Sequence, residues 1–410
     1  MSDLLGLTSV LFVALVVFLC AFRWPEASRI LWVAFLIRTT LAVAHYYGLE
    51  LPDSGSDARS YEKNAWDLAQ QGLFETVGAF RLSGSAFISW VIAIPYALFD
   101  RSLLMAQSIS VLMGVSTVLV GWRIACELGG IEAGRRAGWV LALFPSLVLY
   151  SALPMREPYI TLLLALAVLN AISWFRTRRI RYFFLTVSWF SSAVFFHGGM
   201  AVGLVIYLIV VLIQSGWDLI RGREKTLKSL VLCCLIVGPG SVYLISDFDI
   251  PKLGTLAEMF NEERLVETIR IRSEGAPDGG VGAEYPSWMI PDDMVGLILQ
   301  IPVRAAYFLF APFPWDLQKP IHFFGLLDAL AYWMALLLAW RVRGDLWSDR
   351  VLFPIWLIFF AYVVVFSIGT GNFGSGLRHR SKFVLIPVVL LASYLGGDRR
   401  TNPKRTSKIK

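Results

Sequence analysis

Residues Leu51 to Gly72, LPDSGSDARSYEKNAWDLAQQG, form a polar stretch that follows two long apolar segments. Within it, small or apolar side chains recur at steps of three and four: Ala58, Tyr61, Ala65 and Leu68. This spacing predicts a short amphipathic helix on the membrane surface. Asp57 should then occupy the first turn, where free backbone N–H groups and the helix dipole favour an ionised carboxylate. A helix cap would explain Asp57 equally well on the spacing alone.

The composition is that of a membrane protein. Of the 410 residues, 57% are hydrophobic and 16% are charged, and the mean hydropathy is +0.63. A soluble domain of this length has no use for so much apolar sequence. The net charge of +7 does not indicate a nucleic-acid partner, because the basic residues lie in short loops between apolar runs. Membrane lipids are the expected surroundings.

Apolar runs long enough to cross a bilayer predict an all-α polytopic membrane protein, with about eleven transmembrane helices in a single transmembrane domain, residues 1–410. The runs cover residues 4–22, 30–48, 102–122, 137–153, 159–175, 182–196, 199–216, 229–246, 323–340, 351–369 and 383–397. Basic residues gather in alternate loops and in a tail at residues 398–410. By the positive-inside rule, these parts lie in the cytoplasm.

The same alternation places two loops on the outer face. The first, residues 49–101, should carry Asp57 and juxtamembrane helices, and the second is a long loop at residues 247–322. Within the first loop, the apolar segment from Ser85 to Phe99 is interrupted by Pro95. For the charge pattern to hold, this segment must enter and leave on the outer side. It is therefore predicted to be a re-entrant or interfacial helix.

A second acidic residue, Glu157, follows the run at residues 137–153 and also reaches the outer face. Arg156 beside it supplies a charge partner. An ion pair that anchors the end of a helix would explain these two residues as well as a role in chemistry would.

The outer face also carries candidate cations for a phosphate group. The last outer loop, residues 370–382, reads TGNFGSGLRHRSK, and its glycines predict a mobile, turn-rich backbone that can approach a ligand. Arg378 and Arg380 would present cations there, with His379 between them. The long outer loop offers three alternatives: Arg270, Arg272 and Arg304. Anchoring to lipid headgroups is the competing explanation, although such anchoring favours the cytoplasmic side.

No cofactor is firmly indicated. The histidines are scattered and lack the spacing of metal ligands. The pair Asp53 and Asp57 could hold a divalent cation between them, so a cation stays possible. Arg38 and Asp328 fall inside predicted spans, and such groups face a cavity or each other. The sequence alone gives no reason to pair them.

The pattern Asp57-Ala58-x-x-Tyr61 with Ala65 and Leu68 resembles the first outer loop of the GT-C superfamily, membrane glycosyltransferases that use polyprenyl-linked sugar donors. Later features follow in the same order: the segment Ser85 to Phe99, the span ending near Arg123, Phe144-Pro145 leading to Ser151, Glu157, and the Gly/Arg-rich loop. Residues 50–175 resemble the family best, and residues 370–390 next. The span at 4–22 is a departure, because in many members the first helix leads directly into the catalytic loop.

The resemblance implies a GT-C-like fold with Asp57 and Glu157 as the catalytic carboxylates. It implies transfer of a sugar or oligosaccharide from a polyprenyl-phosphate or diphosphate donor to a glycan or lipid-linked acceptor, in the assembly of surface polysaccharide or glycoconjugate. Tyr61 and Arg156 would then contact substrate. The expected place is a bacterial inner or plasma membrane, with the active site on the periplasmic or extracellular face. A polymerase that joins lipid-linked repeat units is an alternative, as is a flippase or transporter of lipid-linked sugars.

Overall fold

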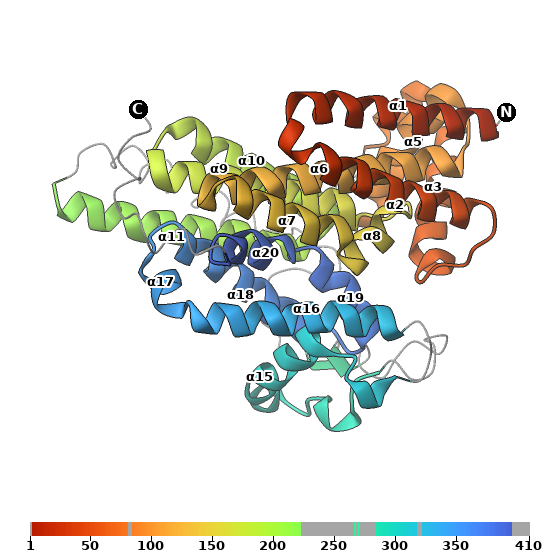
Figure 1. Cartoon of the computed structure of the whole chain (residues 1–410). Coiled ribbons are helices and arrows are strands. Elements are labelled where there is room, and N and C mark those ends of the chain that lie inside the picture. Colours follow the sequence, from red (N-terminus) through yellow and green to blue (C-terminus); the bar gives the residue numbers. More distant parts are fainter. Residues whose placement is uncertain are drawn as a thin grey trace. The chain divides into compact units, whose positions relative to one another are not determined.

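The computed structural model describes residues 2–80, 84–222, 266–267, 269–270, 284–317 and 322–395 (Figure 1). These residues are helical or irregular, and the isolated bridge between Glu284 and Asn372 is the one β-type pairing among them. The chain divides into two compact units. Unit 1 comprises residues 1–169, 334–344 and 381–410, and unit 2 comprises residues 170–333 and 345–380. The all-α prediction is confirmed for the described residues.

Six helical segments in the described residues are long and apolar enough to cross a membrane. They are α1 (Ser2–Arg23), the segment Pro25–Tyr46 containing α2 (Ser28–Tyr46), α6 (Leu103–Gly129), α9 (Glu157–Thr177), the segment Gly198–Ile220 containing α11 (Ala201–Ile220), and α16 (His322–Arg341). Each coincides with a predicted run, which confirms a polytopic membrane protein.

Four shorter apolar helices accompany them: α5 (Gly84–Phe99), α10 (Ile180–Phe196), α15 (Met294–Phe310) and α18 (Leu352–Ile368). Helices α10 and α18 match predicted spans, and a helix of their length rises about 26 Å, slightly less than the roughly 30 Å hydrocarbon core. Helix α15 lies within the predicted long loop. The predicted span at 229–246 and the tail at 398–410 lie outside the described residues.

The predicted run at 137–153 is not one helix. Helix α7 (Ile131–Leu143) ends at Phe144, whose ψ of 121° is extended, and the short helix α8 (Pro145–Ser151) starts anew. A proline disfavours the helical conformation of the residue before it and has no N–H to donate. The break is therefore encoded by Pro145, and the prediction failed because the apolar run continues through it.

The predicted run at 383–397 was also too long. In the described residues its helix is α20 (Leu385–Ala392), which has 8 residues. Such a helix rises only about 12 Å and cannot span the bilayer alone.

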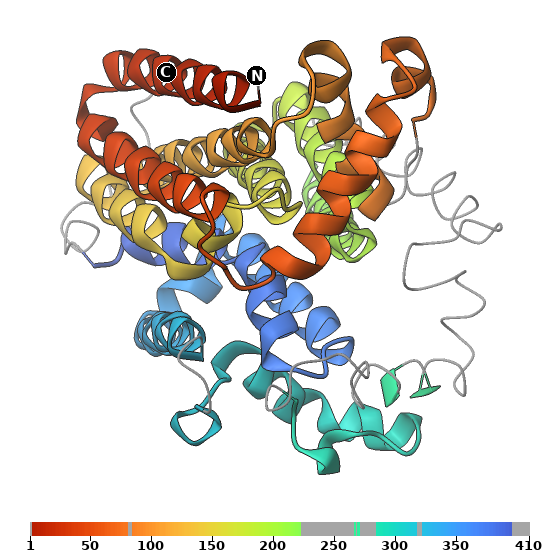
Figure 2. The same cartoon turned by 90° about the vertical axis from the view of Figure 1, so that its right-hand side faces the viewer.

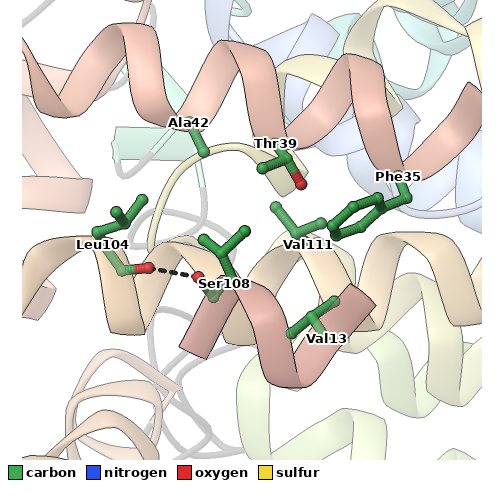
Figure 3. Close-up of a pocket in the computed structure, with 8 residues that line it drawn as sticks. Val13, Phe35, Thr39, Ala42, Leu104, Ser108 and Val111 are labelled. Carbon is green, nitrogen blue, oxygen red and sulfur yellow. Dashed lines mark hydrogen bonds between the residues drawn. The ribbon is translucent and has the colours of Figure 1, made fainter. Parts of the chain in front are cut away.

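Unit 1 is built around α6. Helices α1, α2 and α7 pack along α6, and α20 packs against α6 and α7 (Figure 2). Gly121 permits this close packing, because a Cβ atom there would meet Leu141 of α7 and Leu385 of α20. A hollow between α1, α2 and α6, too narrow to admit a water molecule, is lined by apolar side chains with Thr39 and Ser108 (Figure 3). Ser108 donates to the carbonyl of Leu104 at 2.7 Å, and none of the residues that line this hollow is charged.

A buried arginine donates hydrogen bonds to the backbone carbonyls at the break between α7 and α8. Arg38 of α2 is 0% exposed and donates to the carbonyls of Leu141 at 3.1 Å and Ala142 at 2.8 Å. In an unbroken helix, the N–H of residue 145 would pair with the Leu141 carbonyl, but Pro145 has none. Arg38 thus supplies donors to carbonyls that the break leaves without helical partners.

In unit 2, α15 and α11 pack against α18, and α10 packs against α11. The short helix α19 (Phe373–Ser381) begins just after the bridge between Glu284 and Asn372, and Tyr285 donates its N–H to the Gly371 carbonyl at 2.9 Å. These bonds fix the start of α19 against the segment that leads to α15.

Candidate functional site

Asp57 lies in a tight turn of π-helical type, Ser54–Ala58, immediately before α3 (Arg59–Ala69). The predicted helix is confirmed, and Ala58, Tyr61 and Ala65 form its buried face, while Leu68 is half-buried. Neither the turn nor α3 begins with a side-chain cap. Instead the Asp57 carboxylate accepts a hydrogen bond from the Tyr61 hydroxyl at 3.1 Å. The geometry of Asp57 is therefore that of a hydrogen-bonded acceptor at the head of α3.

The other end of the turn is held by Asp53. Its backbone is left-handed, with a φ of 60°, and its carboxylate accepts a hydrogen bond from the Tyr150 hydroxyl of α8 at 3.1 Å. Aspartate tolerates this conformation better than most residues. π-type turns and left-handed non-glycine residues are both over-represented at functional sites.

Glu157 is the first residue of α9, and 1% of it is exposed. Its Oε1 lies 3.7 Å from Nε of Arg156, so the expected charge partner is found. The same oxygen lies 3.7 Å from Nζ of Lys382, which is fully buried. Glu157 is thus enclosed by protein and flanked by two cations.

Tyr61 and Arg156 connect the two acids. The Arg156 guanidinium lies 5.9 Å from the centre of the Tyr61 ring, and the Tyr61 hydroxyl donates to Asp57. Asp57, Tyr61, Arg156, Glu157 and Lys382 therefore form a continuous series of contacts within unit 1, here named the Asp57–Glu157 cluster. Residues far apart in the sequence, including both predicted catalytic acids, converge in this cluster.

A narrow cleft of about 10 Å³ adjoins the cluster, and Tyr150 and Glu157 line it. Hydroxyl side chains complete much of its wall: Thr117, Ser146, Ser151, Thr161 and Ser381. Three of these donate to carbonyls one turn earlier in their own helices: Thr117, Ser151 and Thr161. Since their hydrogens are used in this way, their oxygen lone pairs remain to accept hydrogen bonds. The cleft wall can therefore accept hydrogen bonds from the O–H group of a water molecule or of a ligand at its mouth.

Two of the predicted phosphate ligands, Arg380 and Arg304, are bonded to protein groups instead. Arg380 is fully buried in unit 2, with its Nε 3.1 Å from Asp328 and its other nitrogens bonded to four backbone carbonyls: Phe308, Leu309, Gly325 and Ala311. Arg304 is 1% exposed and donates to the carbonyls of Met289 and Ile368. The N–H groups of Arg380 and Arg304 are bonded to acceptors in and around α15, α16, α18 and α19. Because these donors connect parts of the protein, we do not assign the phosphate to them. Asp328 finds its partner in Arg380, while Arg38 binds carbonyls.

The predicted mobile loop at 370–382 is wrong, because most of it is helix α19. Asn372 caps this helix by accepting the Ser375 N–H at 2.7 Å. Gly376 serves close packing, since a Cβ atom there would lie 3.1 Å from the Tyr285 hydroxyl. Arg378 is half-buried on this helix, and the ring of His379 lies 5.4 Å from that of His197 and 5.2 Å from that of Phe366.

The remaining predicted substrate-binding residues, Arg270 and Arg272, belong to the long outer loop. Arg270 lies 3.9 Å from Glu267 and 3.8 Å from Asp292, in a partly exposed position. Arg272 lies outside the described residues. In the part of the chain that the structure describes, no group of three or more His, Cys, Asp or Glu residues is arranged to hold a metal ion.

Sequence reasoning missed two residues of the cluster region, Lys382 and Tyr150. Lys382 had a signal, because a lysine directly followed by the apolar run FVLIPVVLLA stands where a helix enters the protein interior. Tyr150 had none, since a tyrosine near the end of an apolar run is usually an interfacial residue.

Comparison with known protein families agrees with the resemblance found in the sequence. Residues 84–243 match a family model described as dolichyl-phosphate-mannose-protein mannosyltransferase, a GT-C superfamily domain. This confirms the predicted resemblance and the predicted enzyme class, a GT-C glycosyltransferase. The matched residues include Arg156 and Glu157 but begin after Asp57. No curated protein matches the chain significantly.

Proposed function

We propose that this chain, whose residues 84–243 match a GT-C domain, transfers a sugar from a polyprenyl-phosphate or polyprenyl-diphosphate donor to a hydroxyl acceptor at the Asp57–Glu157 cluster. The observation that carries the proposal is the convergence of Asp57 and Glu157 through Tyr61 and Arg156. The mannosyltransferase description of the matched family makes mannose the first sugar to test.

In the proposed reaction, an acceptor oxygen attacks the anomeric carbon of the sugar while the bond from that carbon to the phosphate oxygen breaks. Asp57 takes the acceptor proton, a role worth about 10² to 10⁴ in rate. The polyprenyl phosphate, or diphosphate, leaves with the electron pair of the broken bond. Arg156 and Lys382, the cations that flank Glu157, would stabilise the developing charge.

Glu157 and the hydroxyl groups at the wall of the cleft would accept hydrogen bonds from the sugar. A buried carboxylate accepts hydrogen bonds from sugar hydroxyls, and the lone pairs of Thr117, Ser151 and Thr161 add further acceptors. The charge pattern of the loops supports an outer-face site, in a periplasmic or extracellular position. Assembly of a surface polysaccharide or glycoconjugate is the cellular role we propose.

The test is turnover of radiolabelled polyprenyl-phosphate mannose by the full-length protein in nanodiscs, with crude membrane glycans as acceptors. Asp57→Asn should fold normally and lose two or more orders of magnitude in turnover, with the affinity for donor little changed. Asp67→Asn is the matched control, because Asp67 is exposed on the same helix α3. It should retain full turnover.

Two results would contradict the proposal. Near-normal turnover by a well-folded Asp57→Asn protein would remove Asp57 from the mechanism and leave Glu157 as the next candidate. If the wild-type protein consumes neither polyprenyl-phosphate mannose, other polyprenyl-phosphate hexoses nor polyprenyl-diphosphate oligosaccharides, the transferase assignment itself fails. Release of polyprenyl diphosphate, rather than monophosphate, would identify the diphosphate donor class.

A further inference from the structure

A second charged cluster of unit 1 lies beside α3 and has no part in the proposed chemistry. Glu62, the residue after Tyr61, is 6% exposed. Its carboxylate accepts three hydrogen bonds: from the Tyr96 hydroxyl at 3.0 Å, Arg101 Nε at 2.9 Å and Arg101 Nη2 at 2.8 Å. Two parallel bonds from one guanidinium to one carboxylate make a bidentate pair, which fixes orientation as well as distance.

The surroundings of Arg101 strengthen this pair. Its guanidinium lies 5.8 Å from the ring centre of Trp66 on α3, and Trp66 in turn contacts the Tyr96 ring edge-on at 6.4 Å. The hydrogen bonds with Glu62 raise the pKa of Arg101 above its ordinary value. Arg101 therefore holds α3 at two positions one turn apart, Glu62 and Trp66, and Tyr96 ties the same carboxylate to α5.

Asp57 lies between two such attachments. Asp53, before it, is bonded to Tyr150 of α8, and Glu62, after it, is bonded to Tyr96 and Arg101. The turn itself is of the uncommon π type and has no side-chain cap at its start. The bonds at Glu62, together with the packing of α3 on α5, restrain the rotation of α3 about its axis and with it the direction of Asp57 and Tyr61.

We propose that Glu62 and Arg101 are positioning residues, which fix the rotation of α3 so that Asp57 and Tyr61 face Arg156 and Glu157. The inference rests on the proposed function, since the consequence for turnover depends on Asp57. Loss of the pair should misplace the carboxylate by a fraction of a helix turn. Misplacement of a catalytic group by about 1 Å costs up to about a hundredfold in rate.

The experiment measures turnover of polyprenyl-phosphate mannose and hydrogen exchange of residues 59–69 in the full-length protein. Glu62→Gln and Arg101→Met should each lower kcat by about tenfold to a hundredfold, leave KM for the donor unchanged, and speed exchange in α3. The double variant should be no slower than either single one, because both changes break the same pair. Arg101→Lys, which keeps the charge but not the fork, should be intermediate and serves if Glu62→Gln does not fold.

A matched control is the exposed pair Glu132 and Arg135 on α7, in the same unit. Glu132→Gln should leave turnover and exchange of α3 as in the wild type.

The outcomes separate the two proposals. Unchanged exchange in residues 59–69 of Glu62→Gln refutes the positioning role whatever reaction the protein catalyses. Faster exchange with unaltered kcat refutes it as well, and so does a rise in KM with constant kcat, which would make Glu62 a substrate contact. Full activity of Asp57→Asn would refute the catalytic assignment instead, and the exchange measurement would still report whether the pair holds α3.

Discussion

Replacement of Arg38 by methionine tests how the break between α7 and α8 is stabilised. Arg38→Met keeps much of the length and volume of the side chain but removes every donor. The carbonyls of Leu141 and Ala142, which Arg38 reaches at 3.1 and 2.8 Å, would then be buried without that partner. The Ala34 carbonyl loses less, because the backbone N–H of Arg38 is its regular helical donor.

The magnitude follows from two carbonyls. A buried polar group that loses its partner costs about 1 to 3 kcal/mol, so two cost about 2 to 6 kcal/mol. Removing a buried cation returns part of this loss, because the desolvation of the guanidinium no longer opposes folding. We expect a net loss of about 2 to 4 kcal/mol in the free energy of unfolding.

Pro145→Ala provides the second side of a double-mutant cycle. Alanine restores an N–H at residue 145, which can pair with the Leu141 carbonyl when Arg38 is absent. In the Arg38→Met background it should recover about 1 kcal/mol, the net worth of one hydrogen bond. In the wild-type background it should gain less, because Arg38 already occupies that carbonyl.

The assay is reversible unfolding in mixed micelles with increasing SDS, followed by circular dichroism, for the four members of the cycle. Arg135→Met is the control, since Arg135 is exposed in the same unit, and its effect should stay within about 0.5 kcal/mol. Equal stability of Arg38→Met and wild type would refute the reasoning. Strict additivity of the two changes would show that Arg38 does not act on the break at Pro145.

Two further predictions concern unit 2 and the topology. Arg380→Met should lower the free energy of unfolding by about 3 to 5 kcal/mol, because it leaves the Asp328 carboxylate buried without this cation. Adding Asp328→Leu in the same chain should restore much of this loss. Thermal unfolding in detergent measures both, and a stable Arg380→Met single variant would contradict the structural role of Arg380. A cysteine at Ser56, which is exposed, should react with an impermeant maleimide in intact cells, and one at Thr406 in the basic tail should not. Labelling at Thr406 alone would reverse the proposed orientation.

Features that depend on residues close together in the sequence could be predicted from the sequence alone. Apolar length predicts helices such as α1 and α6, and the spacing of Ala58, Tyr61 and Ala65 predicts α3 and its buried face, because helical periodicity is a local property. The helix break at Phe144 is also a local feature, because Pro145 directly after it causes the break. It was missed because the apolar run was given more weight than the proline.

The site depended on contacts between distant segments. Lys382 and Tyr150 had no sequence pattern that joined them to Glu157 and Asp53, and the bidentate pair of Glu62 and Arg101 forms only when α3 packs on α5. In α19, Gly376 lies against Tyr285, where a Cβ atom would lie only 3.1 Å from the hydroxyl, so this glycine serves a contact with a distant segment.

The same physical reason separates Arg380 from Arg378. In the sequence, Arg378 and Arg380 are equivalent cations two positions apart in a glycine-rich segment. The fold turns Arg380 into the interior, where five protein acceptors surround it, and leaves Arg378 half-buried. A buried cation is stable only where acceptors converge on it, and that convergence comes from elements brought together by tertiary packing.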